Sequence, residues 1–187
     1  APSRSPQIQL GSAQLVAQET TAFNVSWINS TGDRQFQSSN ITSLVYRGDS
    51  ESRLIYDAGA VFRISQPGGE GAVLREPPLI VTPERTVITT PRTTSRSTSA
   101  VSGSTALIRA TKLSESVLTR NTQYTNITIN VTSPHWRAWQ TALDERENIN
   151  CGSGDPATET ISCELLDGNS PGVFYLTEAQ INVELTR

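Results

Sequence analysis

Apolar and polar residues alternate with a period of two in several stretches of this chain, and this pattern limits the folds that it can adopt. The alternation is clear in residues 23–27, 127–132 and 181–185. Successive side chains of a β-strand point to opposite faces, so such a stretch has one buried and one solvated face. Turn signals such as Thr31-Gly32-Asp33 separate these stretches and the shorter apolar packets between them. The pattern predicts a mainly β fold, either an antiparallel β-sandwich or a meander.

One segment departs from this period and predicts a short helix at about residues 134–147. Ser133 is a favourable N-cap and Pro134 a favourable first helical residue. The residues that follow have the spacing i, i+3, i+4 and i+7 that places side chains on one helical face: Trp136, Trp139, Gln140 and Leu143. The two tryptophans could form a sugar-stacking platform, but helical spacing favours packing of both rings against the sheet.

The 187 residues fit one domain, which we expect to span residues 1–187. Serine and threonine make up roughly a quarter of the chain, well above ordinary usage. They are densest near residues 90–104, where we expect a mobile segment flanked by partly ordered strands. An O-glycosylated tract is the alternative interpretation of this segment.

The two cysteines, Cys151 and Cys163, enclose a short loop. Metal or redox chemistry would require closer spacing or additional ligands. A disulfide is the favoured interpretation, and it implies an oxidising compartment. We therefore predict an exported protein that lies outside the cell or at its surface.

Five asparagines stand in the N-glycosylation motif Asn-X-Ser/Thr without proline in the middle: Asn24, Asn29, Asn40, Asn126 and Asn130. A chain rich in Ser and Thr produces such motifs by chance, so ordinary polar asparagines are the alternative. Two of the five, Asn24 and Asn130, occupy the polar phase of alternating stretches, where a sugar would project into solvent. We expect at least one modified site in a host that glycosylates exported proteins.

Neither the charge nor the motifs indicate an enzyme. The formal net charge of −3 argues against nucleic-acid binding, which requires clustered Lys and Arg. The single histidine, His135, has no Gly-X-Ser-X-Gly nucleophile motif to accompany it. Acidic residues near 144–147 lack the spacing of a calcium loop. We therefore predict no catalytic residues, no metal site and no cofactor.

Three stretches, residues 44–63, 73–78 and 126–139, carry a resemblance. The last of them reads Asn-Ile-Thr-Ile-Asn-Val-Thr-Ser-Pro-His-Trp-Arg-Ala-Trp, in which a strand leads through Thr-Ser-Pro to an aromatic pair. In this order of patterns the chain resembles the secreted, type IV pilin-like proteins of haloarchaea. The resemblance covers roughly residues 40–147. It implies an extracellular β-rich head that a hydrophobic N-terminal helix would join to a filament.

The leading hypothesis is therefore a non-catalytic structural head of a pilin-like or surface-appendage protein. Its expected partners are copies of itself or other pilin-like subunits, with glycans as further candidates. Contact with a membrane would occur only through the N-terminal helix, which we expect ahead of Ala1. The alternative hypothesis is a secreted β-sandwich that serves as an adhesion, carbohydrate-binding or protein-binding module.

Overall fold

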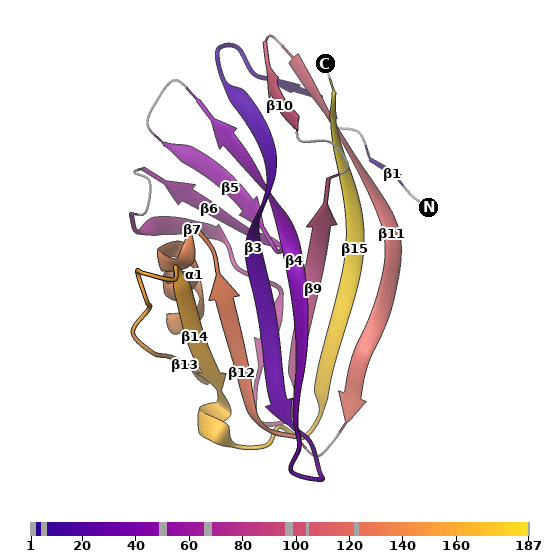
Figure 1. Cartoon of the computed structure of the whole chain (residues 1–187), viewed down its shortest axis with the longest axis vertical. Coiled ribbons are helices and arrows are strands. Elements are labelled where there is room, and N and C mark those ends of the chain that lie inside the picture. The colour runs from indigo at the N-terminus through magenta and orange to yellow at the C-terminus, as the bar shows by residue number, and fades with distance from the viewer. Residues whose placement is uncertain are drawn as a thin grey trace.

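The computed structural model describes residues 3–4, 7–48, 52–65, 69–95, 99–103, 105–121 and 124–186. Within these residues, two twisted β-sheets pack face to face, and one α-helix lies against the larger sheet (Figure 1). The fold is mainly β with one short helix, which confirms the prediction from the sequence.

The strands of the described residues form a smaller and a larger sheet. The six-stranded sheet contains, in spatial order, β1 (Ser3–Arg4), β11 (Thr105–Asn121), β15 (Phe174–Thr186), β9 (Thr86–Thr94) and β8 (Leu79–Val81), with β2 (Gln7–Gln9) also paired to β11. The nine-stranded sheet contains β13 (Ile149–Cys151), β14 (Thr160–Leu165), β12 (Thr125–Thr132), β3 (Gln14–Ile28), β4 (Arg34–Arg47), β5 (Arg53–Asp57), β6 (Ala60–Ile64) and β7 (Gly71–Arg75), with β10 (Ser99–Ser102) also paired to β3.

One strand pair departs from the antiparallel arrangement that the sequence suggests. β15 runs parallel to β9, in register from Phe174 opposite Thr86 to Asn182 opposite Thr94. A parallel pair needs a long crossover connection, and here the intervening chain builds β10 to β14 and the helix. Local patterns carry no information about such a distant pairing.

The turn of the β3–β4 hairpin is stabilised by backbone and side-chain hydrogen bonds. Its turn closes through a hydrogen bond of 3.0 Å from the Gly32 amide to the Asn29 carbonyl, and Gly32 has a φ of 84°. The Asn29 Oδ1 accepts hydrogen bonds from the backbone amides of Thr31 and Asp33 at 3.1 and 2.8 Å. In the turn, these two amides have no partner on a neighbouring strand, and the Asn29 side chain accepts their hydrogen bonds instead, as in an Asx turn. The turn predicted at Thr31-Gly32-Asp33 is confirmed.

The main core lies between the two sheets and under the helix. Trp27 of β3 packs edge to face on Phe174 of β15, with ring centroids 5.6 Å apart. Trp139 of the helix packs on Phe62 of β6 and on Phe23 of β3, at 5.4 and 5.8 Å. All three contacts lie in the range of favourable aromatic geometry. The aromatic side chains therefore join the smaller sheet, the larger sheet and the helix into one core.

The helix α1 (Trp136–Asp144) lies inside the predicted range of 134–147 but begins later than expected. Ser133 and Pro134 precede it in a turn in which the Trp136 amide bonds to the Ser133 carbonyl at 3.0 Å. His135 is the N-cap and makes no side-chain capping bond. The predicted N-cap at Ser133 and first helical position at Pro134 are thus wrong, because the helix begins only at Trp136. The buried Ser133 hydroxyl accepts hydrogen bonds from the His135 amide in the preceding turn and from the Thr21 hydroxyl of the core. Both predicted packing residues, Trp136 and Trp139, are buried.

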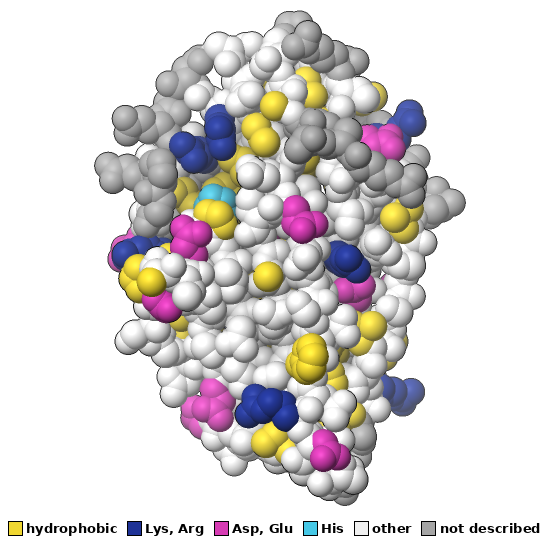
Figure 2. Space-filling view, viewed as in Figure 1, with side chains coloured by type: hydrophobic (Ala, Val, Ile, Leu, Met, Phe, Trp, Pro, Cys, Tyr) yellow, Lys and Arg dark blue, Asp and Glu magenta, His cyan; other side chains and the backbone are white. Residues whose placement is uncertain are grey.

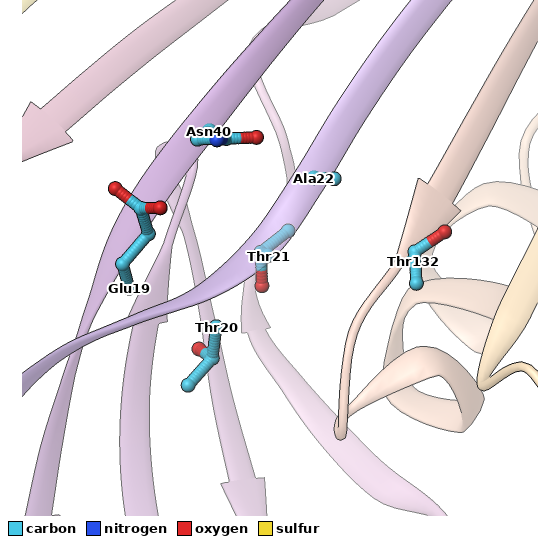
Figure 3. A pocket seen from close by; sticks show the side chains of 6 residues that line it. All are labelled: Glu19, Thr20, Thr21, Ala22, Asn40 and Thr132. Carbon is cyan, nitrogen blue, oxygen red and sulfur yellow. The ribbon is translucent and has the colours of Figure 1, made fainter.

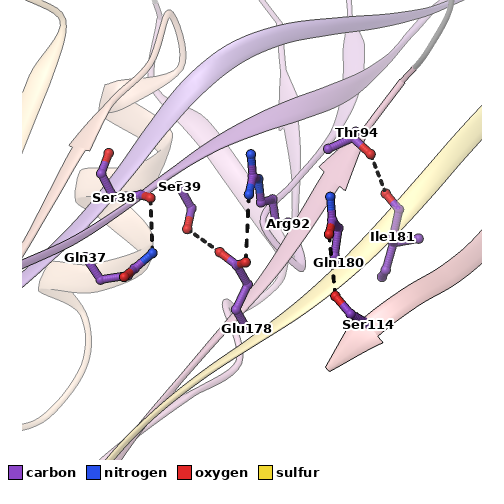
Figure 4. Close-up of polar contacts among 9 residues, drawn as sticks. All are labelled: Gln37, Ser38, Ser39, Arg92, Thr94, Ser114, Glu178, Gln180 and Ile181. Carbon is purple, nitrogen blue, oxygen red and sulfur yellow. Dashed lines mark hydrogen bonds and ion pairs between the residues drawn. The ribbon is translucent and has the colours of Figure 1, made fainter. Parts of the chain in front are cut away.

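A polar seam joins the two sheets where β4 crosses β9 and β15 (Figure 4). Glu178 of β15 accepts a hydrogen bond of 2.6 Å from the Ser39 hydroxyl of β4, and Arg92 of β9 lies 3.9 Å from the same carboxylate. The buried Thr93 hydroxyl donates to the Thr42 carbonyl at 2.6 Å. These bonds fix the lateral position of one sheet on the other.

The Ser/Thr-rich segment 90–104 includes the end of β9 and the whole of β10. β9 continues to Thr94 because Thr93 is buried and the strand stays paired with β15. Strand β10 occupies residues 99–102, so β-strands flank the middle of this segment, and its mobility stays a prediction. The part of it at residues 96–98 and 104 lies outside the described residues. No helix among the described residues has both the length and the apolar composition needed to cross a membrane.

Candidate functional site

Four of the five predicted glycosylation asparagines lie on the larger sheet and point away from the core. Asn24 of β3 stands between the buried Phe23 and Val25, and Asn130 of β12 stands between buried residues in the same way. These two asparagines are direct neighbours across the strands. Asn40 of β4 and Asn126 of β12 are exposed. The fifth asparagine, Asn29, lies in the turn at the end of the same sheet.

The outer face of the larger sheet carries mostly small polar side chains in cross-strand rows. One row, from β14 to β4, is Ser162, Asn130, Asn24 and Ser38. The next row, from β13 to β4, is Asn150, Glu164, Thr128, Ser26 and Phe36. Figure 2 shows mostly uncharged polar surface over β3, β4, β12 and β14, with acidic and basic side chains scattered on it. Phe36 is 75% exposed, which is unusual for an aromatic side chain on such a face.

A polar groove of about 440 Å³ crosses the end of this face. Its lining combines amide, hydroxyl, carboxylate and guanidinium groups with one glycine: Arg34, Asn126, Thr128, Asn150, Gly152, Ser162 and Glu164. We call this site the polar groove. No apolar side chain contributes to its lining.

Two positions with left-handed backbone, Asn126 and Gly168, lie at the edge of the polar groove. Asn126 adopts a left-handed conformation with φ of 49°, which asparagine tolerates better than most residues. A β-carbon at Gly168 would lie 3.1 Å from both the Asn126 Oδ1 and the Glu164 Oε1. Gly168 has a φ of 78° and leaves room for both side chains. On the other side, the Arg34 Nη1 donates a hydrogen bond of 3.2 Å to the Ser26 hydroxyl.

A smaller pocket of about 230 Å³ lies farther along the same sheet, at a bulge in β3 (Figure 3). The β3–β4 register shifts between Glu19 and Thr21, which leaves Thr20 as the additional residue. Asn40 of β4 and Thr132 of β12 line the pocket from the neighbouring strands. The bulge directs Thr21 into the core, where its hydroxyl becomes part of a buried network.

That network surrounds Asp57, a fully buried carboxyl at the end of β5. Its Oδ2 accepts hydrogen bonds from the Thr21 hydroxyl at 2.6 Å and from the Trp139 indole at 3.0 Å. The Thr21 Oγ1 lies 2.9 Å from the Ser133 Oγ, which accepts a bond from the His135 amide. Burial raises the pKa of Asp57 above its ordinary value, and the hydrogen bonds from Thr21 and Trp139 oppose this shift. The network anchors the helix to the sheet.

These residues do not form a hydrolytic triad, although the network contains serine, histidine and aspartate. His135 joins it through its backbone amide, not through its imidazole. Burial and the positive charges of Arg53 and Arg47 lower the pKa of the imidazole to about 4. In the part of the chain that the structure describes, no group of three or more His, Cys, Asp and Glu residues is arranged to hold a metal ion.

The predicted disulfide between Cys151 and Cys163 is confirmed. The two residues are cross-strand neighbours in the β13–β14 hairpin. Cys163 is fully buried, and Cys151 packs against the main core. The bridge therefore fixes the strand that carries Asn150 to the strand that carries Glu164, both of which line the polar groove.

A comparison with family models shows where this chain belongs. The model of a family of unknown function, DUF7289, matches residues 1–184. The chain belongs to the DUF7289 family. Searches of curated proteins and of solved structures found no match for this DUF7289 chain. Its function must therefore be argued from its own surfaces.

Sequence reasoning found the asparagines of the DUF7289 chain but not the polar groove. Arg34, Asn150 and Glu164 lie in separate segments with no motif in common. Only the strand register brings them to one end of one face. In the sequence, Glu164 and Asn150 stand at polar positions of alternating stretches, which predicts that their side chains are exposed. The alternation does not predict which residues lie beside them on neighbouring strands.

Proposed function

We propose that this chain is the extracellular, non-catalytic head of a pilin-like or surface-appendage protein. A hydrophobic N-terminal helix would join it to the filament, and copies of itself or related subunits would pack around it. The disulfide supports an oxidising location, and the position of four glycosylation motifs on one outer face supports a surface that faces solvent.

The observation that carries this proposal is an open strand edge with exposed apolar side chains. β11 pairs with β15 along its length, but on its other side the residues that the structure describes pair with it, through β1 and β2, only at 105–107 and 110–111. Beyond that point, Leu113, Val117 and Leu118 are 47%, 62% and 38% exposed. Exposed apolar side chains on a strand edge promote association, although the exposed ion pair of Lys112 and Glu115 lies among them. A lateral contact between subunits would bury these side chains.

The shape of this edge favours contact through side chains over addition of a regular strand. The β11–β15 register shifts between Lys112 and Ser114 and again between Val117 and Thr119. Bulges of this kind interrupt the row of backbone donors and acceptors that a continuous partner strand would use. The additional residues at the two shifts, Leu113 and Leu118, are both exposed. The edge therefore suits packing of a neighbouring subunit and disfavours uncontrolled strand aggregation.

Cysteine cross-linking in the source cells tests this proposal. A Val117→Cys variant that carries a thiol-reactive photo-cross-linker at this position is expected to form cross-linked dimers and higher multimers at the cell surface, because the label on each copy would react with the neighbouring copy that it faces. The control is Leu74→Cys on β7, which replaces a similarly exposed apolar residue (54%) on the larger sheet. Cross-linking of Val117→Cys without cross-linking of Leu74→Cys supports the proposal. Exclusively monomeric protein from both variants contradicts it.

A further inference from the structure

The polar groove has a composition that a purely structural subunit does not require. It gathers side chains from four strands, β4, β12, β13 and β14, and the backbone of the loop at Gly152 completes it. The side chains of Asn126 and Glu164, which line it, both lie beside Gly168, where the absence of a β-carbon leaves room for them. Exposed polar side chains are common, but convergence of a few oriented polar groups in one concavity is the usual mark of a ligand site.

The chemistry of the lining narrows the class of ligand. Arg34 and Glu164 bring one positive and one negative formal charge, so the lining is neutral overall. This balance disfavours a phosphate or a nucleic acid, which would need an excess of basic groups. The asparagine amides and the hydroxyls both donate and accept hydrogen bonds. A neutral ligand that carries many hydroxyl groups matches this set.

The strand arrangement disfavours a peptide at the same place. β14 is already paired on both sides, with β12 and β13, and β12 is paired with β14 and β3. An extended peptide binds a sheet by completing an unpaired edge. The unpaired edges near the groove belong to β13, a strand of three residues, and to β4 before Leu44, so a peptide there would lie beside the groove and not across it. The groove also lacks the apolar pockets that anchor peptide side chains. A ligand must therefore bind through side chains on the face of the sheet.

The exposed Phe36 adds the apolar element that such a ligand would use. Phe36 lies opposite Ser26, which lies opposite Thr128 of the groove. Strands are about 4.8 Å apart, so the Phe36 position is roughly 10 Å from Thr128 along one row. An aromatic ring exposed at this distance offers a flat apolar surface to a second part of a long ligand.

We propose that the polar groove and Phe36 together bind a neutral oligosaccharide that lies across strands β13, β14, β12, β3 and β4. Sugar hydroxyls would bond to Arg34, Glu164 and the asparagine amides, and a further ring would stack on Phe36. This inference goes beyond the structural function proposed above, and the failure of either leaves the other standing.

The sugar has two possible sources that share this chemistry. Asn126 lines the groove and also belongs to the glycosylation motif Asn126-Ile127-Thr128. A glycan attached to Asn126 would place its own sugars in the groove. A free or foreign oligosaccharide would bind only where Asn126 carries no glycan.

The first arm of the test uses protein from a bacterial host that does not glycosylate. Saturation-transfer NMR and calorimetry are carried out with neutral oligosaccharides of glucose, mannose, galactose and N-acetylglucosamine. At least one of them is expected to bind. Glu164→Gln and Phe36→Ala should each weaken binding about tenfold or more, the loss expected for a charged hydrogen bond or a large contact. The controls Glu145→Gln and Leu74→Ala change exposed residues outside the groove and should leave affinity unchanged.

The second arm uses protein from the source cells. Glycopeptide mass spectrometry asks whether Asn126 is modified, and amide exchange asks whether the glycan protects residues beside Ser162 and Asn150. A glycan on Asn126 that protects these residues supports the proposal with the chain's own sugar as ligand. The proposal is overturned if no oligosaccharide binds the unmodified protein and native Asn126 carries no protecting glycan. It is equally overturned if binding survives the Glu164 and Phe36 changes.

Discussion

The indole Nε1 of Trp139 donates a hydrogen bond of 3.0 Å to the Oδ2 of Asp57, a carboxyl with no solvent exposure. This bond joins the helix to the end of β5, and Thr21 of β3 donates to the same oxygen. Three segments distant in sequence thus depend on one buried acidic group. A buried carboxyl is costly in its charged form, so the pH should control how much this group contributes to stability.

Stability should fall as the pH rises through the folded-state pKa of Asp57. Burial raises this pKa above the ordinary value of 3.8, so the folded protein holds the proton more tightly than the unfolded chain does. The free energy that Asp57 contributes to folding is therefore fully present below pH 3.8 and is lost as the pH increases through the raised pKa. Urea unfolding of the wild type and Asp57→Asn from pH 4 upward measures it. As the pH rises, the free energy of unfolding of the wild type should fall relative to that of Asp57→Asn. A difference in free energy that stays constant with pH would contradict this account.

His135 should produce the opposite dependence on the acidic side. Its pKa is lowered from 6.5 to about 4, chiefly by burial and then by Arg53 and Arg47. The folded state therefore binds the proton less tightly than the unfolded chain does. The free energy that the neutral His135 contributes to folding is fully present above pH 6.5 and is lost as the pH falls through about 4. The full loss is on the order of 3 kcal/mol. His135→Gln should be less sensitive than the wild type to acidification over this window, and equal sensitivity in urea unfolding would argue against a buried neutral imidazole.

Removal of the disulfide should weaken the sandwich without abolishing its β structure. Cys151 and Cys163 are 12 residues apart, and closure of a loop of this size stabilises by about 3 kcal/mol in the chain-entropy model. The double variant Cys151→Ala/Cys163→Ala should lose about this amount in urea unfolding, with added cost from the cavity at buried Cys163. An unchanged midpoint would show that the hairpin needs no covalent constraint.

Gly59 should be far less tolerant of substitution than Gly32, although both have a positive φ, of 86° and 84°. A β-carbon at Gly59 would lie 2.9 Å from Pro78 Cδ and 3.1 Å from Pro91 Cγ, whereas one at Gly32 meets nothing within 4 Å. Gly32→Ala should cost about 1–2 kcal/mol for its backbone conformation alone. Gly59→Ala should cost a further 1–3 kcal/mol or so from crowding of the two rings. Equal losses in thermal unfolding would mean that the prolines move aside freely.

The sequence predicted local structure well because local structure depends on neighbouring residues. The alternation at residues 127–132 became β12, and the spacing of Trp136 and Trp139 became one buried face of α1. Asp57 shows the limit of this reasoning. It precedes the Ala58-Gly59 turn, where aspartate is ordinarily solvated, yet it is buried because Trp139 and Thr21 reach it from distant segments.

The polar groove and the open edge of β11 have the same origin in long-range pairing. Nothing near Glu164 predicts that Thr128 and Asn150 will flank it on neighbouring strands. Likewise, the exposure of Val117 follows from where β1 and β2 end against β11, some hundred residues away in sequence. Strand register is set by the whole sheet, so these two surfaces could be found only in the folded chain.

The central claim, that this chain is a subunit of a surface filament, is tested most directly by electron microscopy of the source cells. Antibodies raised against the folded domain, with gold labels, should decorate filaments at the cell surface along their length. Filaments sheared from these cells should contain the chain as a main component in mass spectrometry. Label confined to the medium, with the chain recovered there as a free monomer and absent from sheared filaments, would contradict the claim.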